Sequence, residues 1–244
     1  MNLFVYDDFL NKSRYNRVLN KIEIRLTDLG LNGKIIRLGS IKNINSLVHQ
    51  EVRNGAKNII AVGNNETANK VVSALVDDSL SDLFLKNILF SLIPIGDNQS
   101  IARSLGIEKE EEACNTILAR RIEKINIGLA GKSFFINKAE IIKPQIGLDI
   151  NDFKIEIKEK NHLNIYNLND NPQLLNKDFN FNKEKVKILI NGKNNDLSYF
   201  QCDQVKVNGD AQLTLDNAKS INLPTNISLV KNKLNVIVGK NRLF

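Results

Sequence analysis

The first half of the chain alternates short apolar runs with apolar positions spaced three or four residues apart. The apolar runs have the length of buried strands and occupy residues 3–6, 34–38, 58–62 and 88–93. Helical spacing follows them over residues 15–29, 44–52 and 68–76, and a shorter helix ends near Gly106. This alternation predicts an α/β domain with a parallel sheet, whose strand-to-helix turns form one edge and the expected ligand site.

From about Arg121 onward the apolar pattern changes to a period of two. It is clearest at alternate residues over 153–157 and again over 186–190. The second half is therefore predicted to be all-β and antiparallel. We place the boundary between domains 1–122 and 123–244, and we expect the last residues to return to the first domain.

Two turns and one loop are predicted within the second half. Asn208-Gly209, between apolar stretches at 205–207 and 213–215, is typical of a hairpin turn. Lys231-Asn232-Lys233 separates two further alternating stretches and predicts a second hairpin. The Asn-rich segment 161–182 has few periodic apolar positions and is expected to be a loop.

Composition fits a folded protein and excludes several classes. Apolar residues make up 42% and charged residues 25%, close to globular averages. No apolar run approaches the roughly 20 residues of a membrane span, and the first residues lack the basic start of a signal peptide, so we expect a cytoplasmic protein. Cys114 and Cys202 lie far apart and predict neither a disulfide framework nor a metal site.

The net charge of +7 would suit an anionic partner, but this is a weak indication. The Lys residues are dispersed along the chain, without the basic stripe and interleaved aromatic residues of a nucleic-acid surface. We therefore expect no nucleic-acid partner.

Two turns of the α/β half carry a family resemblance. Ile59-Ile60-Ala61-Val62-Gly63-Asn64-Asn65-Glu66-Thr67 resembles the strand and Gly-Gly-Asp-Gly-Thr loop that diacylglycerol, sphingosine and NAD kinases share. Residues 92–107, Leu-Ile-Pro-Ile-Gly-Asp-Asn-Gln-Ser-Ile-Ala-Arg-Ser-Leu-Gly-Ile, are similar to the lipid-kinase run Pro-x-Gly-Thr-Gly-Asn-Asp-x-Ala-Arg-x-Leu-Gly. The chain thus resembles the diacylglycerol kinase catalytic-domain family, whose fold joins an NAD kinase type α/β domain to an antiparallel β domain.

The resemblance implies a nucleotide site and a catalytic base. Backbone N–H groups of such glycine turns approach phosphate oxygens closely, and the helix behind each turn favours negative charge. The implied nucleotide-binding residues are Gly63, Asn64, Asn65, Glu66, Thr67, Gly96, Asp97 and Asn98. The segment Asn208-Gly209-Asp210 falls where lipid kinases carry an Asp-Gly-Glu whose acidic residue acts as general base. The resemblance therefore implies Asp210 as the catalytic base.

The departures from the family lie in the residues that would touch phosphate and metal. Asn64, Asn65 and Glu66 replace Gly, Asp and Gly in the first loop. In the second loop Asp97 replaces Thr, Asn98 replaces Gly and Gln99 replaces Asn. Because Asp is a favoured helix cap, Asp97, or Ser100 if the helix starts later, is predicted to cap the helix at Ile101 and fill the anion site from within.

Other polar residues leave alternatives open. Asp7 and Asp8 are either a solvated turn or, with Asp97, a relocated cation site, and we assign no metal ligand. His49 and His162 are expected at the surface. Arg103 matches the family motif, but a salt bridge on the helix surface explains it equally well.

Three functions remain. The first is ATP-dependent phosphorylation of a lipid hydroxyl, with magnesium as cofactor and with weak or lost activity. The second is a non-catalytic pseudokinase with no cofactor, acting as a lipid-binding or protein-interaction module. The third, NAD kinase, shares only the first motif. We expect a lipid, the inner membrane face, a protein partner or a second copy as partner, and whether the chain is an enzyme stays open.

Overall fold

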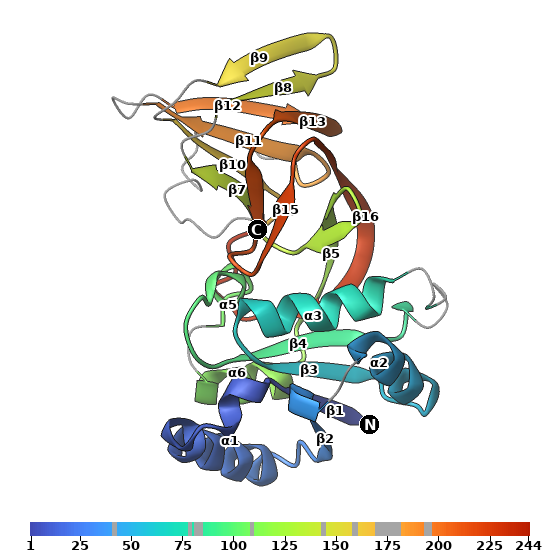
Figure 1. The fold of residues 1–244 in the computed structure, drawn as a ribbon. Coiled ribbons are helices and arrows are strands. Elements are labelled where there is room, and N and C mark those ends of the chain that lie inside the picture. Colours follow the sequence, from blue (N-terminus) through green and yellow to red (C-terminus); the bar gives the residue numbers. More distant parts are fainter. Residues whose placement is uncertain are drawn as a thin grey trace. The chain divides into compact units, whose positions relative to one another are not determined.

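A computed structural model describes residues 1–40, 43–77, 80, 85–107, 110–142, 145–157, 161–168, 182–192 and 197–244. The chain divides into two compact units (Figure 1). Unit 1 comprises Met1–Ile125 and Asn232–Arg242, and unit 2 comprises Asn126–Lys231 with Leu243–Phe244. Two strands, β5 (Ile122–Ala130) and β16 (Thr225–Ile237), contribute residues to both units.

Unit 1 is built on a parallel sheet in the order β2-β1-β3-β4-β16. Its first four strands are β1 (Asn2–Tyr6), β2 (Gly33–Arg37), β3 (Asn58–Gly63) and β4 (Leu89–Pro94). Both β3 and β4 are buried along their whole length because helices cover both faces of the sheet. The four apolar runs in the sequence are thus confirmed as strands.

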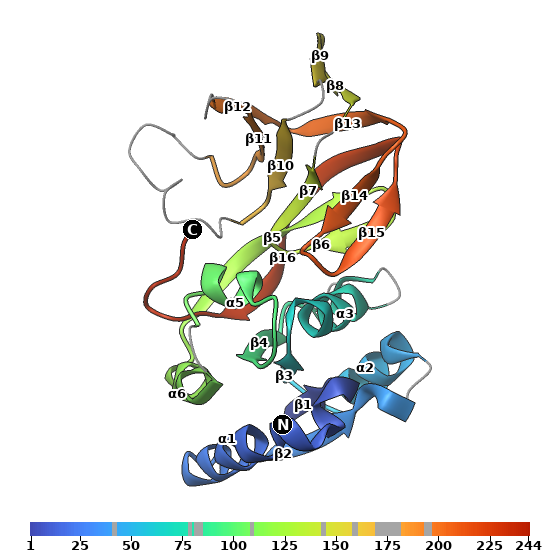
Figure 2. The same cartoon turned by 60° about the vertical axis from the view of Figure 1, so that its left-hand side comes forward.

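The helices of unit 1 lie on two sides of this sheet. They are α1 (Asn16–Asp28), α2 (Ile44–Arg53), α3 (Asn65–Val76), α5 (Ser100–Ser104) and α6 (Glu110–Ala119). Helix α2 packs beside α3 on one face, and α1 packs beside α6 on the other (Figures 1 and 2). The α/β class is confirmed, whereas α6 was not predicted.

The C-terminal segment of unit 1 packs against the turn after α5. The N–H of Gly239 donates to the carbonyl of Leu105 over 2.8 Å, and that of Val238 donates to Arg121 over 2.9 Å. Gly106, at φ +74°, is in such close contact that a Cβ there would lie 2.5 Å from the backbone nitrogen of Arg242. Gly106 is therefore required by packing.

Unit 2 contains two antiparallel β layers around one core, as the period of two predicts. One layer is a six-stranded sheet in the order β12-β11-β10-β7-β14-β15. Its strands are β7 (Lys138–Ile142), β10 (His162–Tyr166), β11 (Val186–Asn191), β12 (Leu197–Cys202), β14 (Gln212–Leu215) and β15 (Lys219–Asn222). The other layer includes β13 (Gln204–Gly209), β8 (Ile146–Ile150), β9 (Phe153–Ile157) and the start of β16, while β6 (Ser133–Phe135) pairs with β5.

A buried polar network lies beside β10 and β11. The Asn167 amide donates to the carbonyls of Asn126 and Ile136, each over 2.7 Å. Lys187, which is only 5% exposed, donates from Nζ to the carbonyl of Asn167 over 2.8 Å. Burial and, less strongly, the charge of Lys183 lower the pKa of Lys187 to about 8.

Both predicted hairpins are wrong. Strand β13 pairs with β8 and β16, whereas β14 pairs with β7 and β15. Asn208-Gly209 therefore ends β13, and the chain then crosses to the other layer. Strand β16 runs without a turn through Lys231-Asn232-Lys233, where Asn232 takes φ +50°. Asn tolerates this left-handed conformation, so one irregular residue replaces the expected turn.

The Asn-rich segment is not a loop throughout, because β10 occupies His162–Tyr166 within it. The rest of that prediction, over residues 169–181, lies outside the described residues. Across the part of the chain that the structure describes, no helix is both long and apolar enough to cross a membrane.

Candidate functional site

The turn between β3 and α3 brings backbone N–H groups to the carboxyl edge of the sheet. Gly63 ends β3 at φ +155°, and a Cβ there would clash with the Thr67 hydroxyl. Asn64 is the N-cap of α3, and its side-chain oxygen accepts from the N–H groups of Glu66 and Thr67 over 3.0 and 3.2 Å. The Thr67 hydroxyl accepts the N–H of Asn64 over 3.2 Å, which completes a capping box.

Every backbone N–H of residues 64–67 donates a hydrogen bond inside the protein. Three of these groups are held by the capping box. The fourth, the N–H of Asn65, donates to the carbonyl of Asn98 in the next turn over 3.0 Å. A phosphate oxygen could bind these groups only by displacing existing acceptors.

The turn between β4 and α5 is tied to the first one. The N–H of Ile95 donates to the carbonyl of Gly63 over 2.9 Å, and Gly96 takes φ +87°. Asn98 takes φ +56°, a conformation that Asn tolerates, so the turn keeps a left-handed residue where the family has Gly. The amide of Gln99 donates to the carbonyl of Gly96 over 2.7 Å and closes the turn.

The predicted cap by Asp97 or Ser100 is wrong. Gln99 is the N-cap residue of α5, and its side chain makes no capping hydrogen bond. The acceptor comes instead from the first turn, where the Asn65 oxygen accepts the N–H of Ile101 over 3.2 Å and its amide donates to the Ser100 hydroxyl over 2.8 Å. The helix is capped from within the protein, but by a residue distant in sequence.

The turn after β1 supplies a third group to this edge. Asp7 is 8% exposed, and its carboxylate accepts the Thr67 hydroxyl over 2.7 Å and the N–H of Phe9 over 3.3 Å. Asp8 contacts Gly39 and accepts from the Asn11 amide over 2.9 Å, whereas Asp97 is exposed. Within the described ranges no group of three or more acidic, His or Cys side chains is placed to hold a metal ion.

Aromatic side chains cover the second glycine. The Phe9 ring lies 3.1 Å from the position of a Cβ on Gly96. Tyr15 packs edge-on against Phe9 with ring centroids 5.2 Å apart, and the Arg14 guanidinium lies 4.7 Å from the Tyr15 centroid. No periodic apolar pattern predicts this contact, because Phe9 follows the strand in a single 3₁₀ turn, Asp8–Asn11.

Tyr6, at the end of β1, is fully buried beneath this edge. Burial raises the pKa of its phenol well above the ordinary value, and the charge of Glu23 adds to the rise. The Arg37 guanidinium lies 5.2 Å from the ring centroid. Tyr6 is therefore a neutral packing residue at physiological pH.

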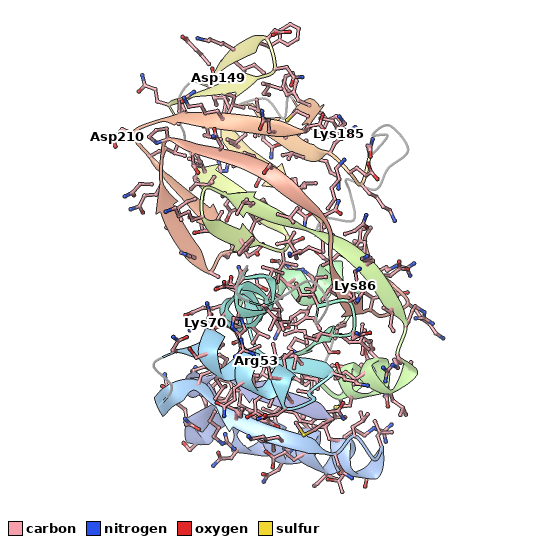
Figure 3. All side chains as sticks on the ribbon, turned by 90° about the vertical axis from the view of Figure 1, so that its right-hand side faces the viewer. Arg53, Lys70, Lys86, Asp149, Lys185 and Asp210 are labelled. Carbon is pink, nitrogen blue, oxygen red and sulfur yellow. The ribbon has the colours of Figure 1, made fainter. Side chains whose placement is uncertain are left out.

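Asp210 belongs to unit 2 and is exposed at the bend after β13 (Figure 3). Its neighbour Asn208 donates from the side-chain amide to a carboxylate oxygen of Asp149 over 2.9 Å. The structure thus places Asp210 on a different unit from the two turns.

The structure also places the two histidines, Arg103 and the two cysteines that the sequence singled out. His49 is buried, not at the surface as predicted, and its Nε2 is 2.7 Å from the carbonyl of Ala74 in α3. His162 is exposed, and Arg103 is exposed on α5. Cys114 and Cys202 are free and buried.

The fold and the paired glycine turns define an α/β domain of the kind found in nucleotide-dependent kinases. A model of the diacylglycerol kinase catalytic domain matches residues 2–130, and the chain belongs to this family. No curated protein matches the chain.

Two solved structures show the same fold. A diacylglycerol kinase from Bacillus anthracis str. Sterne aligns with TM-score 0.78 and 13% identity over 99% of this chain and 97% of that one. An NAD kinase from Archaeoglobus fulgidus, solved in complex with ATP, aligns with TM-score 0.59 and 10% identity over 100% and 96% of the two chains. The two-part fold expected from the resemblance is confirmed.

Proposed function

We propose that this chain is a non-phosphorylating member of its family, a pseudokinase that binds magnesium-ATP weakly or not at all and acts as a lipid-binding or protein-interaction module. The observation that carries the proposal is the complete internal pairing of the N–H groups of residues 64–67. In a working phosphate loop, those groups are the donors for the nucleotide.

The substituted side chains weaken phosphate binding in two further ways. Glu66 places a carboxylate in the first turn of α3, where it repels an anion, although it is ion-paired to Lys70 at 2.7 Å. Asn65 stands where the family has Asp, so an amide engaged with α5 replaces a carboxylate. If each lost contact costs about 2.7–4 kcal/mol of transition-state stabilisation, two losses reduce the rate by about four orders of magnitude or more.

The second candidate is ATP-dependent phosphorylation of a lipid hydroxyl in phospholipid metabolism. It is favoured by the turns themselves, since Gly63 and Gly96 keep positive φ angles and α3 begins directly behind the first turn. In that function ATP would lie along Gly63 and Gly96 with magnesium, and Asp210 would accept the proton of the lipid hydroxyl. A cytoplasmic protein at the inner membrane face would suit either candidate.

Isothermal titration with magnesium-ATP and with ADP separates the two candidates. We expect no binding to the unmodified protein at micromolar nucleotide. The triple variant Asn64→Gly, Asn65→Asp, Glu66→Gly restores the family residues and frees the N–H groups of positions 66 and 67, whose acceptor is the Asn64 side chain. We expect this variant to gain measurable nucleotide binding.

Asn43→Gly is the matched control, because Asn43 caps α2 by accepting the N–H of Ser46 over 3.1 Å and lies in another helix. It should lose a similar amount of stability and gain no nucleotide binding. Micromolar binding of magnesium-ATP to the unmodified protein would overturn the proposal, as would transfer of labelled phosphate to diacylglycerol in vesicles.

A further inference from the structure

Strand β9 is the free edge of a β layer in unit 2. The strand order ends at β9, and among the described strands its partner is β8. Figures 1 and 2 show no other described element of unit 2 beyond it. Phe153, at its start, is 71% exposed, so both the strand edge and part of its apolar face are uncovered. Such an edge is a template for another strand.

The hairpin geometry determines which backbone groups are free. Ile150 and Phe153 pair across the two-residue turn Asn151-Asp152. The pair that flanks such a turn exchanges both backbone hydrogen bonds, and every second pair along the ladder does the same. The N–H and C=O groups of Phe153 therefore face β8, whereas those of Lys154 and Glu156 face outward.

We propose that β9 pairs antiparallel with β9 of a second copy of this chain, with Ile155 opposite the partner's Ile155. In this register Lys154 lies opposite the partner's Glu156, and Glu156 lies opposite the partner's Lys154. These are the residues with outward-facing backbone groups, so each of the two pairs exchanges two backbone hydrogen bonds. The same two pairs bring opposite charges together.

The charges of the neighbouring strands continue this pattern. Lys206 of β13 pairs with Asp149 of β8, and Asp149 pairs with Lys154 of β9. Lys154 in turn meets the partner's Glu156, so the signs alternate over the four residues from Lys206 to the partner's Glu156. Lys154 and Glu156 are both exposed in the single chain, and the partner's Glu156 gives Lys154 an acidic neighbour on its open side.

The opposite face of the same pairing is apolar. Ile155 lies opposite Leu148 of β8, and Leu148 lies opposite Val207 of β13. Across the two-fold axis, the exposed Phe153 comes beside the partner's Ile157, and Ile157 is 2% exposed. A second copy therefore extends the apolar face and covers the Phe153 ring.

The pairing is short, and its strength follows from its size. A five-residue strand buries less than the roughly 1,200 Å² typical of a stable interface, so we expect a weak dimer that forms as concentration rises. Analytical ultracentrifugation of the full chain from micromolar to near-millimolar concentration measures this equilibrium.

Charge exchange tests the register. Lys154→Glu and Glu156→Lys each place like charges opposite one another twice in a homodimer, and each should weaken dimerisation by roughly tenfold or more. An equimolar mixture of the two variants restores both opposite-charge pairs, so it should form heterodimers as strongly as the unmodified chain. A purely structural effect of either substitution would not be reversed by mixing.

Lys132→Glu is the control, because Lys132 is an exposed lysine at another turn of unit 2 and should leave dimerisation unchanged. Thermal unfolding of each variant checks that the fold is intact. An unmodified chain that stays monomeric at every concentration would overturn the proposal. Dimers that resist both single substitutions would also overturn it, as would a mixture that shows no recovery.

Discussion

Lys187 shows how one buried side chain makes stability depend on pH. Its ammonium group is enclosed beside β10 and β11, and it donates to the carbonyl of Asn167. Removing a cation from water disfavours its charged form, which is why the pKa falls to about 8. In the unfolded chain the same group titrates near its ordinary value of about 10.4.

The expected consequence is stability that rises with pH above 8. Below pH 8 both states hold the proton, so the cost of burying the charge is constant. Between about pH 8 and pH 10.4 the unfolded chain binds more protons than the folded one, and the free energy of unfolding therefore increases. Relative to Lys187→Met, the unmodified protein should gain about 2 kcal/mol between pH 8 and pH 10 in urea unfolding.

Lys132→Met serves as the comparison for this measurement, since Lys132 is exposed. Its stability should run parallel to that of the unmodified protein over the same pH range. If the Lys187→Met variant also runs parallel, the ammonium group is not destabilised by burial.

Most elements of unit 1 were predictable from the sequence, whereas helix α6 of unit 1 and several strand pairings of unit 2 were not. Strands β3 and β4 are buried on both faces, so they appear as continuous apolar runs between helical patterns. Helix α6 was missed because it opens with three consecutive Glu residues, Glu110–Glu112, and has few buried positions. The β13–β14 hairpin was wrong because strand pairing depends on partners distant in sequence.

The positions of the two turns of the candidate site were predictable from the sequence, but their hydrogen bonds were not. The motif located both turns, and the structure joins them by hydrogen bonds between Asn65 and the segment from Asn98 to Ile101. Which residue caps which helix was not predictable, because the capping oxygen of Asn65 comes from a different turn. Sequence rules for helix capping consider only residues next to the helix, and they therefore predicted Asp97 as the cap.

Asn232 allows a test of strand β16 as a continuous element. At φ +50° a β-branched side chain is disfavoured, whereas Gly is tolerated. We expect Asn232→Val to lower the free energy of unfolding by about 1–2 kcal/mol, and Asn232→Gly to change it by less. Equal losses in the two variants, measured by chemical unfolding, would contradict a left-handed residue at this position.

At the scale of the whole molecule, the chain leaves unit 1 along β5, forms unit 2 and comes back along β16. The returning residues pair with β4 through Asn235 and Val236, and the segment after them packs on Gly106. Gly106, the last glycine of the family motif, is thus explained by its contact with the C-terminal segment and not by phosphate binding.

Gly106→Ala should detach the C-terminal segment. A Cβ at this position would overlap the backbone of Asn241 and Arg242, and φ +74° adds strain. We expect a loss of more than about 3 kcal/mol and faster proteolysis near the C-terminus.

Gly30→Ala is the control, since Gly30 has φ +65° and open space around it. It should cost only about 1 kcal/mol and leave proteolysis unchanged. Similar losses in the two variants would show that backbone strain, and not packing on the C-terminal segment, determines the effect at Gly106.

The position of β16 also bears on protein synthesis. The ribosome makes β4 long before residues 232–237, and the whole of 126–231 is translated in between. During that interval β4 has an unpaired edge, which is a site of misassembly for a nascent chain. Unit 2 can therefore complete its layers first, and the earlier part of the polypeptide reaches its final sheet only when the last strand emerges.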